Sequence, residues 1–369
     1  MEPFIHLHVH TQYSLLDGQA SIDALIDKAQ KDGMNAIAVT DHGNMFGIKE
    51  FFNKVSKKNG KPLGAIKDLE KEQKALKGKE ALSTEEQARL QEIPSLIEAE
   101  KKKIFKPIIG CECYCARNGR HNKTAKEDRS GYHLIVLAKN LRGYKNLIKM
   151  VSISWTEGFY GRPRIDHELL EKYHEDLIVC SACLGGEIPQ HIMHDRIDKA
   201  EESILWFKKL FGEDYYLEMQ RHETHDPNAD CTTYPKQQEV NKVLIELARK
   251  HNVKLIATND VHFVNQEDAE AHDRLICLST GKDLDDPTRM RYSKQEWMKT
   301  TAEMNAIFAD IPEVLSNTLE IADKVDFYSI DSGPIMPTFA IPEEFGTEES
   351  YRAKLTEQDL FEEFTRDEN

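Results

Sequence analysis

The sequence predicts an α/β barrel of parallel strands, and three observations support this fold class. Short apolar runs rich in β-branched residues alternate with stretches of helical period, which is typical of parallel strands joined by right-handed crossovers. The runs alternate little in polarity, as strands buried on both faces do. Polar motifs follow several different strands, and a barrel gathers such loops at one rim more easily than an open doubly wound sheet. The seven predicted strands are residues 4–9, 35–40, 107–114, 132–138, 176–181, 214–219 and 253–258.

Amphipathic stretches between these runs are predicted to be helices. Ser21 is the predicted N-cap of the first, because Ile22, Leu25 and Ile26 follow it at helical spacing. The predicted helices include residues 21–31, 141–152, 199–211 and 235–251.

A charged segment, residues 57–103, interrupts this rhythm and is predicted to form a helical hairpin inserted into the barrel domain. It consists largely of Lys, Glu, Gln, Ala and Leu. Ser83 and Glu86 have the pattern of a capping box that opens the second helix, and Gly78 can end the first. Such a protrusion is usually solvated and passive, and a docking arm is the alternative.

The chain changes character again near residue 331. Pro334, Pro337 and Pro342 predict an extended linker, and the last residues predict the start of a helix. The expected division is a barrel domain over 1–330, which contains the insertion, and a linker with the start of a following domain over 331–369.

Composition limits the class of partner. The net charge of -15 and a pI near 5.5 argue against general coating of nucleic acid, since phosphate binding draws on a surplus of Lys and Arg. Any DNA contact must therefore be local or assisted by metal. With no apolar run of about 18 residues and no signal peptide, we expect a soluble cytoplasmic chain without a membrane partner. The 7 cysteines are predicted to be reduced thiols.

Alternate histidines open the chain. His6, His8 and His10 lie in the first predicted strand, where alternate side chains share a face. Three imidazoles on one face suggest a metal site, although a surface strand with a wet side has the same pattern. Other imidazoles and carboxylates follow later strands or loops and can reach the same centre: Asp17, His42, Asp260 and His262.

Glu112 lies within a C-x-C-x-C run, so this segment can offer either a carboxylate ligand or a zinc–thiolate site. Strand alternation puts Glu112 on one face and the three cysteines on the other. We therefore predict that Glu112 faces into the barrel and the cysteines face helices. Cys183 lies just beyond a strand end and can reach a metal as thiolate, whereas Cys180 is predicted to be a core residue.

The remaining histidines fit less well. His133 lies near the start of its apolar run rather than the end. His222 is predicted to contact substrate and His225 to face solvent. Each histidine alone is as often structural as functional, but chance convergence of so many is not expected.

Imidazole, carboxylate and thiolate ligands together suit zinc, manganese or iron better than magnesium or calcium. The candidates exceed what one zinc needs, which indicates two or three metals. Clustered metals suit hydrolysis of phosphate esters and would let an acidic chain handle DNA. Arg162, Arg164 and Lys139 are candidates for phosphate contacts, and Arg164 is predicted to bind substrate.

Longer strings of residues resemble the PHP (polymerase and histidinol phosphatase) domain found at the N-terminus of bacterial DNA polymerase III alpha subunits. The resemblance runs from Phe4 to Tyr328 and omits the insertion. Segments 15–18 and 183–186 are similar to the polymerase branch rather than to histidinol phosphatase. The strings that carry the resemblance are HLHVHTQYSLLDG at 6–18, TDHGN at 40–44, GFY at 158–160, PRID at 163–166 and CLGGEIP at 183–189.

This resemblance implies a distorted seven-stranded (β/α) barrel, the PHP fold, with a trinuclear metal centre at its C-terminal rim. It implies two to three divalent ions, zinc, manganese or iron, and 3′→5′ exonuclease (proofreading) activity. His6 has only a supporting role. The implied ligands are His8, His10, Asp17, His42, Glu112, His133, Cys183, Asp260 and His262, and Asp17, His42, Asp260 and His262 are assigned to catalysis.

The resemblance also implies a DNA 3′ end as substrate, and the remaining polymerase domains and other replisome subunits as partners. No polymerase activity is expected here, because the family's catalytic aspartates belong to a later palm domain. Two alternatives stay open. The ligands can serve folding alone, in a noncatalytic scaffold and docking module of the polymerase, since metal binding free energy can become folding free energy. A histidinol-phosphatase-like enzyme for small molecules is the other.

Overall fold

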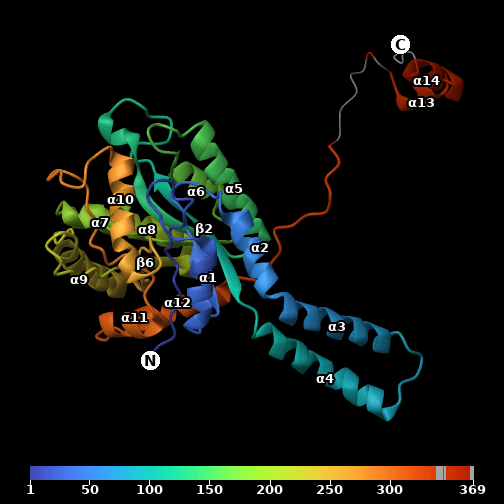
Figure 1. Cartoon of the computed structure of the whole chain (residues 1–369), viewed down its shortest axis with the longest axis horizontal. Coiled ribbons are helices and arrows are strands. Elements are labelled where there is room, and N and C mark those ends of the chain that lie inside the picture. Colours follow the sequence, from blue (N-terminus) through green and yellow to red (C-terminus); the bar gives the residue numbers. More distant parts are fainter. Residues whose placement is uncertain (338–343, 345, 366–369) are drawn as a thin grey trace. The chain divides into compact units, whose positions relative to one another are not determined.

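A computed structural model shows a curled mixed sheet with helices packed around it (Figure 1). The structure describes residues 1–337, 344 and 346–365. The chain divides into two compact units, Met1–Ile330 and Asp331–Asn369. The first unit holds the whole sheet and every residue predicted to act at the site.

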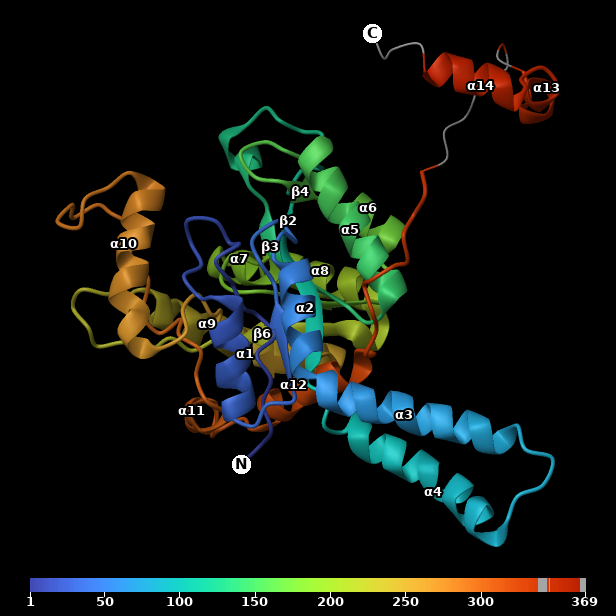
Figure 2. The same cartoon turned by 45° about the vertical axis from the view of Figure 1, so that its right-hand side comes forward.

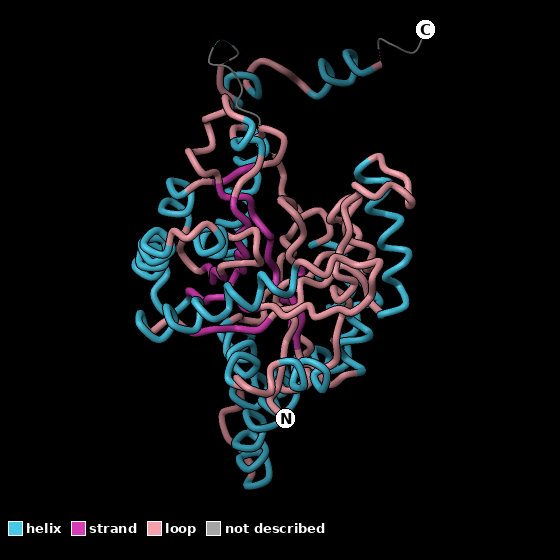
Figure 3. The backbone as a smooth tube through the Cα atoms, turned by 90° about the vertical axis from the view of Figure 1, so that its left-hand side faces the viewer, coloured by secondary structure: helices cyan, strands magenta, loops and turns pink. Residues whose placement is uncertain are grey.

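The sheet has seven strands in the order β1-β2-β3-β5-β6-β7, with the short β4 paired to β2 (magenta in Figure 3). The runs predicted from residue 35 onward as strands are all strands, and only β4 was not predicted. Their bounds are β1 Ala36–Val39, β2 Lys106–Cys115, β3 Tyr132–Ala138, β4 Arg164–Ile165, β5 Leu177–Cys180, β6 Tyr215–Met219 and β7 Lys254–Ala257.

The prediction that all strands run parallel is wrong for β3, which is antiparallel to both β2 and β5. The connection from β2 to β3 carries a short 3₁₀ turn, Lys126–Arg129, instead of a crossover helix. The chain therefore returns alongside β2 as in a hairpin. As a result, the start of β3 lies beside the end of β2, with His133 opposite Tyr114.

Residues 4–9 were predicted to be a regular strand, and this prediction is also wrong. The segment is extended, but its hydrogen bonds alternate between two partners instead of forming a ladder with one. The amides of Ala38 and Thr40 donate to the carbonyls of His6 (2.9 Å) and Val9 (2.8 Å) on one side. On the other side, Val9 pairs with Val261, just beyond β7. The segment thus bridges the two sheet edges and closes a distorted barrel.

Helices surround the sheet, as Figure 2 shows from a second side. The predicted helices are present, and the hydroxyl of Ser21 caps α1 by accepting from the amide of Ala24. The helices of the barrel unit outside the insertion are α1 Ile22–Lys31, α2 Ile48–Lys58, α5 Leu141–Thr156, α6 His167–Tyr173, α7 Glu187–Met193, α8 Ile197–Phe211, α9 Thr233–His251, α10 Ala269–Thr280, α11 Thr301–Ile307 and α12 Glu313–Lys324, with short 3₁₀ turns at Gly212–Asp214 and Gln266–Asp268.

The charged insertion forms two helices, α3 Gly60–Lys77 and α4 Thr84–Lys101, which pack against each other and project from the barrel (Figures 1 and 2). The capping box predicted for Ser83 and Glu86 is present at the start of α4, and Gly78 ends α3. The hairpin contributes no ligand-type residue to the clusters described below.

The second unit contains α13 Glu348–Arg352 and α14 Glu357–Phe364. Pro334 and Pro337 lie in chain without regular structure, as a linker requires, and Pro342 lies outside the described residues. Among the described residues, no helix is both long and apolar enough to cross a membrane.

Candidate metal centre

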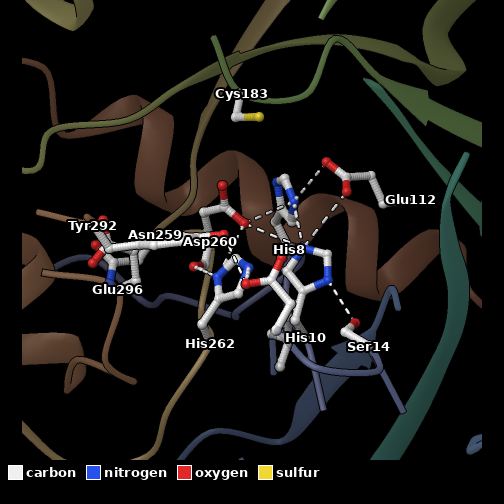
Figure 4. Close-up of polar contacts among 12 residues, drawn as sticks. His8, His10, Ser14, Glu112, Cys183, Asn259, Asp260, His262, Tyr292 and Glu296 are labelled. Atoms are coloured by element: carbon white, nitrogen blue, oxygen red, sulfur yellow. Dashed lines mark hydrogen bonds and ion pairs between the residues drawn. The ribbon is translucent and has the colours of Figure 1, made fainter. Parts of the chain in front are cut away.

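The residues predicted as metal ligands come together at one end of the barrel. They come from the barrel-closing segment, from the loops after β1, β5 and β7, from β2 and from the start of β3. Figure 4 shows His8, His10, Glu112, Asp260 and His262 with polar contacts among them, and Cys183 on the far side of the group. Sets of ligand atoms that lie within 4.8 Å of one another are His10–His42–His262, His8–His10–Glu112 and Glu112–His133–Cys183.

Hydrogen bonds fix the orientation of the His8 and His10 rings. Nδ1 of His8 donates to Oε1 of Glu218 at 2.7 Å, an oxygen that also accepts from the side chains of Gln220 and Thr258. Nδ1 of His10 donates to Oγ of Ser14 at 2.9 Å, since that hydroxyl gives its own proton to the carboxylate of Asp41 at 2.8 Å. Whenever the two rings are neutral, their lone pairs are therefore on Nε2.

These two lone pairs face each other inside the protein. The Nε2 atoms of His8 and His10 are 3.1 Å apart, and Oδ1 of Asp260 lies 3.1 Å and 3.2 Å from them. Three acceptors this close, on fully or largely buried side chains, repel one another unless a proton or a metal cation lies between them. Nitrogen and oxygen donors at these separations match the ligand set of zinc and similar ions. The residues therefore fit a divalent metal.

Glu112 links this group to a second one. Its Oε2 contacts Nδ1 of His42, and its Oε1 lies 2.7 Å from Nδ1 of His133. The sulfur of Cys183 is 3.5 Å from the same His133 nitrogen. Glu112 thus faces into the barrel as alternation predicted. The antiparallel direction of β3 explains why His133 reaches the centre although it starts its strand.

Asp17 and His262 complete the centre on its other side. Oδ2 of Asp17 is 3.0 Å from Nε2 of His42, and the hydroxyl of Tyr292 donates to Oδ1 of Asp17 at 2.8 Å. Nδ1 of His262 donates to the backbone carbonyl of Asp260 at 2.8 Å. Its buried Nε2 then has no hydrogen-bond partner among the described residues, as expected for a ligand atom.

The electrostatics of the centre favour positive charge. Burial alone would raise the pKa values of Glu112 and Asp260, but the surrounding imidazoles hold both well below their usual range. Burial, with His42 and His262 nearby, lowers the pKa of His10 to about 3, so that ring is neutral. Burial would lower the pKa values of His8 and His42, but the nearby carboxylates raise both well above the usual imidazole range. The centre thus holds positive charge beside its ionised carboxylates, and metal ions can supply that charge in place of ring protons.

Part of the backbone strain lies at the same place. Leu16, Ala182 and Asp260 adopt left-handed φ angles of 61°, 62° and 47°. Leu16 directly precedes Asp17 and Ala182 directly precedes Cys183, whereas Asp260 itself carries a predicted ligand carboxylate. Left-handed conformations cost energy for residues other than glycine and cluster at functional sites.

Several other predicted residues lie elsewhere or play another part. His6 is buried and its Nε2 donates to the carbonyl of Lys299 at 2.8 Å, so it supports the segment without joining the centre. His222 lines a cavity of about 250 Å³ together with Cys183 and Tyr292, and its role in substrate binding stays a prediction. His225 faces solvent with a side chain 90% exposed.

The prediction that Arg164 binds substrate is wrong. Arg164 is only 1% exposed. Its guanidinium donates to four backbone carbonyls at 2.7–3.0 Å and so joins the loop before β4 to the loop between β2 and β3. The carbonyls belong to Gly158, Arg120, Asn122 and Asp128.

Lys139 is also a wrong candidate for a phosphate contact, because it lies beyond the end of β3 opposite to His133 and pairs there with Asp214 at 2.5 Å. Arg162 remains a candidate. It is exposed and lies over the ring of Tyr114, 5.6 Å from the centroid, and Tyr114 in turn stacks on His42.

Sequence reasoning missed the residues that orient the ligands, namely Ser14, Asp41, Glu218 and Tyr292. Glu218 gave a usable signal. It is the one charged residue in the apolar run that forms β6, and a charge inside a buried strand requires a partner.

Removing the Arg164 guanidinium should destabilise the fold. Arg164→Ala leaves buried carbonyls without donors, and we expect the free energy of unfolding to fall by about 3 kcal/mol or more. Urea denaturation followed by circular dichroism measures this change. The exposed Arg162→Ala is the matched control and should stay within about 0.5 kcal/mol of wild type. Equal loss in both variants would contradict the structural role of Arg164.

Comparisons with known proteins agree with this geometry. Residues 6–222 match the family model described as PHP domain. DNA polymerase III subunit alpha of Borreliella burgdorferi is 44% identical over 362 residues, which cover 97% of this chain and 27% of that protein. The subunits of Treponema pallidum and Thermus aquaticus are 35% and 36% identical, over 98% and 96% of this chain and 26% and 25% of theirs.

The chain thus spans about a quarter of the length of these relatives, and it matches their N-terminal region. One solved structure, a candidate metal-dependent phosphoesterase from Bifidobacterium adolescentis, covers 71% of this chain and 88% of its own at 14% identity. Its TM-score of 0.32 is too low to support an argument. The family model matches more than half of the chain, and the chain therefore belongs to the PHP domain family.

Proposed function

We propose that this chain is a metal-dependent phosphoesterase that removes nucleotides from the 3′ end of DNA. The observation that carries the proposal is the convergence of Nε2 of His8, Nε2 of His10 and Oδ1 of Asp260, at 3.1–3.2 Å from one another. Two or three divalent ions, zinc, manganese or iron, would be held by the following residues: His8, His10, Asp17, His42, Glu112, His133, Cys183, Asp260 and His262.

When bound, such ions lower the pKa of a coordinated water and neutralise charge on the phosphate and the leaving oxygen. The chain's own residues keep the ligands ready for this role. Glu218 holds the proton of His8 on Nδ1, and Ser14 does the same for His10. The cavity beside Cys183, Tyr292 and His222 lies next to these groups and is open to solvent on one side, so it can admit a chain end.

DNA is the proposed substrate because the relatives are alpha subunits of DNA polymerase III. In such a polymerase, an exonuclease site in this domain would act on 3′ ends after misincorporation. The rest of the polymerase and other replisome subunits are the proposed partners. Arg162, exposed above Tyr114 at the rim, is the proposed contact for a backbone phosphate.

A noncatalytic, metal-stabilised scaffold is the second candidate, and one observation favours it. The segment of His8 and His10 and the segment of Asp260 and His262 are the two that close the barrel, through the pairing of Val9 with Val261. A metal between them would therefore stabilise closure whether or not it catalyses hydrolysis. Metal removal that lowers the melting temperature of a chain unable to shorten DNA would favour this candidate.

The catalytic proposal predicts that ligand variants lose nuclease activity. We expect His10→Ala and Asp260→Asn to shorten a 3′-labelled single-stranded DNA at least about 100-fold more slowly than wild type in manganese or zinc, since even residues that only orient ligands typically contribute 10–100-fold. The solvent-facing His225→Ala is the matched histidine control and should keep full activity. Full activity in the two ligand variants would show that another site, or a contaminant, cleaves the DNA.

The hydrogen bond from His8 to Glu218 leads to a separate prediction about metal affinity. In Glu218→Gln the amide can donate to Nδ1 of His8 and move the ring proton to Nε2, where it blocks the metal. We expect metal affinity to fall about 10- to 100-fold, as measured by competition with a chelator. Glu320→Gln is the control. Glu320 accepts from the hydroxyl of Tyr216, which lies on β6 as Glu218 does, but Glu320 is not part of the centre. Unchanged affinity in Glu218→Gln would refute the proposed role of this carboxylate.

A further inference from the structure

We propose that the chain binds a further metal ion, zinc, at a second site behind the first centre, through Cys115, His167 and Glu187. The sulfur, one ring nitrogen and one carboxylate oxygen of these residues all lie within 4.8 Å of one another. Glu112 and Cys115 are three residues apart on β2, so their side chains leave opposite faces of the strand. The proposed site is therefore outside the barrel interior and does not share ligands with the first centre.

Three element ends bring these side chains together. Cys115 is the last residue of β2, His167 is the first of α6, and Glu187 is the first of α7. Cys115 and Glu187 are buried, whereas the side chain of His167 is 40% exposed. The buried Cys115 and Glu187 are thus close to the surface beside His167, where an ion can enter.

The carboxylate and the ring are already held in place. Oε1 of Glu187 accepts from the hydroxyl of Ser203 at 2.5 Å, and its Oε2 lies 3.2 Å from Nε2 of His167. The His167 ring stacks on Trp206 with a centroid distance of 3.9 Å and an interplanar angle of 14°. Such restraint on ligands is what a metal site needs, because little freedom is lost on binding.

A fourth position is available in the adjoining pocket of about 400 Å³, which His167, Glu187 and His191 line. His191 follows Glu187 by four residues in α7, so both side chains lie on the same face of the helix. Its buried Nδ1 has no hydrogen-bond partner among the described residues. The His167–Glu187 ion pair alone explains neither this nitrogen nor the thiol. Thiolate, imidazole and carboxylate ligands with one further position suit tetrahedral zinc.

A zinc ion here would fix a loop that serves the first centre. Glu187 directly follows the loop of Cys183, whose Gly185 carbonyl accepts from the amide of His133 at 3.0 Å. Cys115 lies on the strand that carries Glu112. The ion would therefore brace two ligand-bearing segments from outside, and its binding does not depend on whether the first centre hydrolyses DNA.

Zinc content tests the proposal directly. The full chain, freed of metal and then equilibrated with zinc buffered in slight excess, is measured by elemental analysis. We expect Cys115→Ser and His167→Gln each to hold one zinc fewer per chain than wild type. Cys113→Ser is the matched control, because this buried thiol shares the outer face of β2 and belongs to none of the ligand clusters among the described residues. Equal zinc content in all variants would overturn the proposal.

Cobalt gives a second readout that does not depend on stability. Because Trp206 stacks on His167, cobalt bound there should quench its fluorescence. The titration uses a Trp155→Phe/Trp297→Phe background, which leaves Trp206 of the three tryptophans. Both replaced residues lie near the first centre, because Trp155 donates to the carbonyl of Gly43 and Trp297 pairs with Phe263 beside His262. Adding His167→Gln should abolish the quenching, with circular dichroism confirming the fold, and adding Trp206→Phe should remove the signal. Undiminished quenching in the His167→Gln protein would refute the site.

Discussion

The arrangement depends on one constraint: the buried carboxylate of Asp260 faces two imidazoles whose protons are held elsewhere. Glu218 and Ser14 accept hydrogen bonds from Nδ1 of His8 and His10, which turns both Nε2 atoms toward Oδ1 of Asp260. A proton or a metal cation among these atoms makes the arrangement favourable in a buried setting. The same residues belong to the first and last segments of the barrel, which pair through Val9 and Val261. A metal that neutralises the charge at the centre would therefore also stabilise closure of the barrel.

The β2 strand organises the chemistry on both of its faces. Its inward residue Glu112 joins His42 to His133, and the reversed direction of β3 is what allows His133 to meet it. Its outward residue Cys115 lies against the starts of α6 and α7. One strand in the barrel wall can carry ligands for two centres. Side chains that are close in sequence on such a strand can leave opposite faces of the sheet.

Much of the fold and of the ligand set could be predicted from sequence because both depend on local patterns. Apolar runs predicted the strands from β1 onward except β4, and the alternate spacing of His8 with His10 and of Asp260 with His262 predicted side chains that the structure brings together. The direction of β3 could not be predicted, because it depends on how a loop without a helix returns. Arg164 was misassigned because a guanidinium that binds backbone carbonyls has the same sequence signature as one that binds phosphate. Glu218 was missed because its partner is 210 residues away.

Anomalous diffraction from crystals of the zinc- or manganese-loaded chain tests the central claim most directly. The account predicts a peak at about 2.0–2.2 Å from Nε2 of His8 and from Oδ1 of Asp260. Further peaks would show how many ions the remaining ligands hold. Density for a fully loaded protein with no peak between these atoms, and with their separations unchanged, would mean that a proton balances the carboxylate and that the centre is not built for metal.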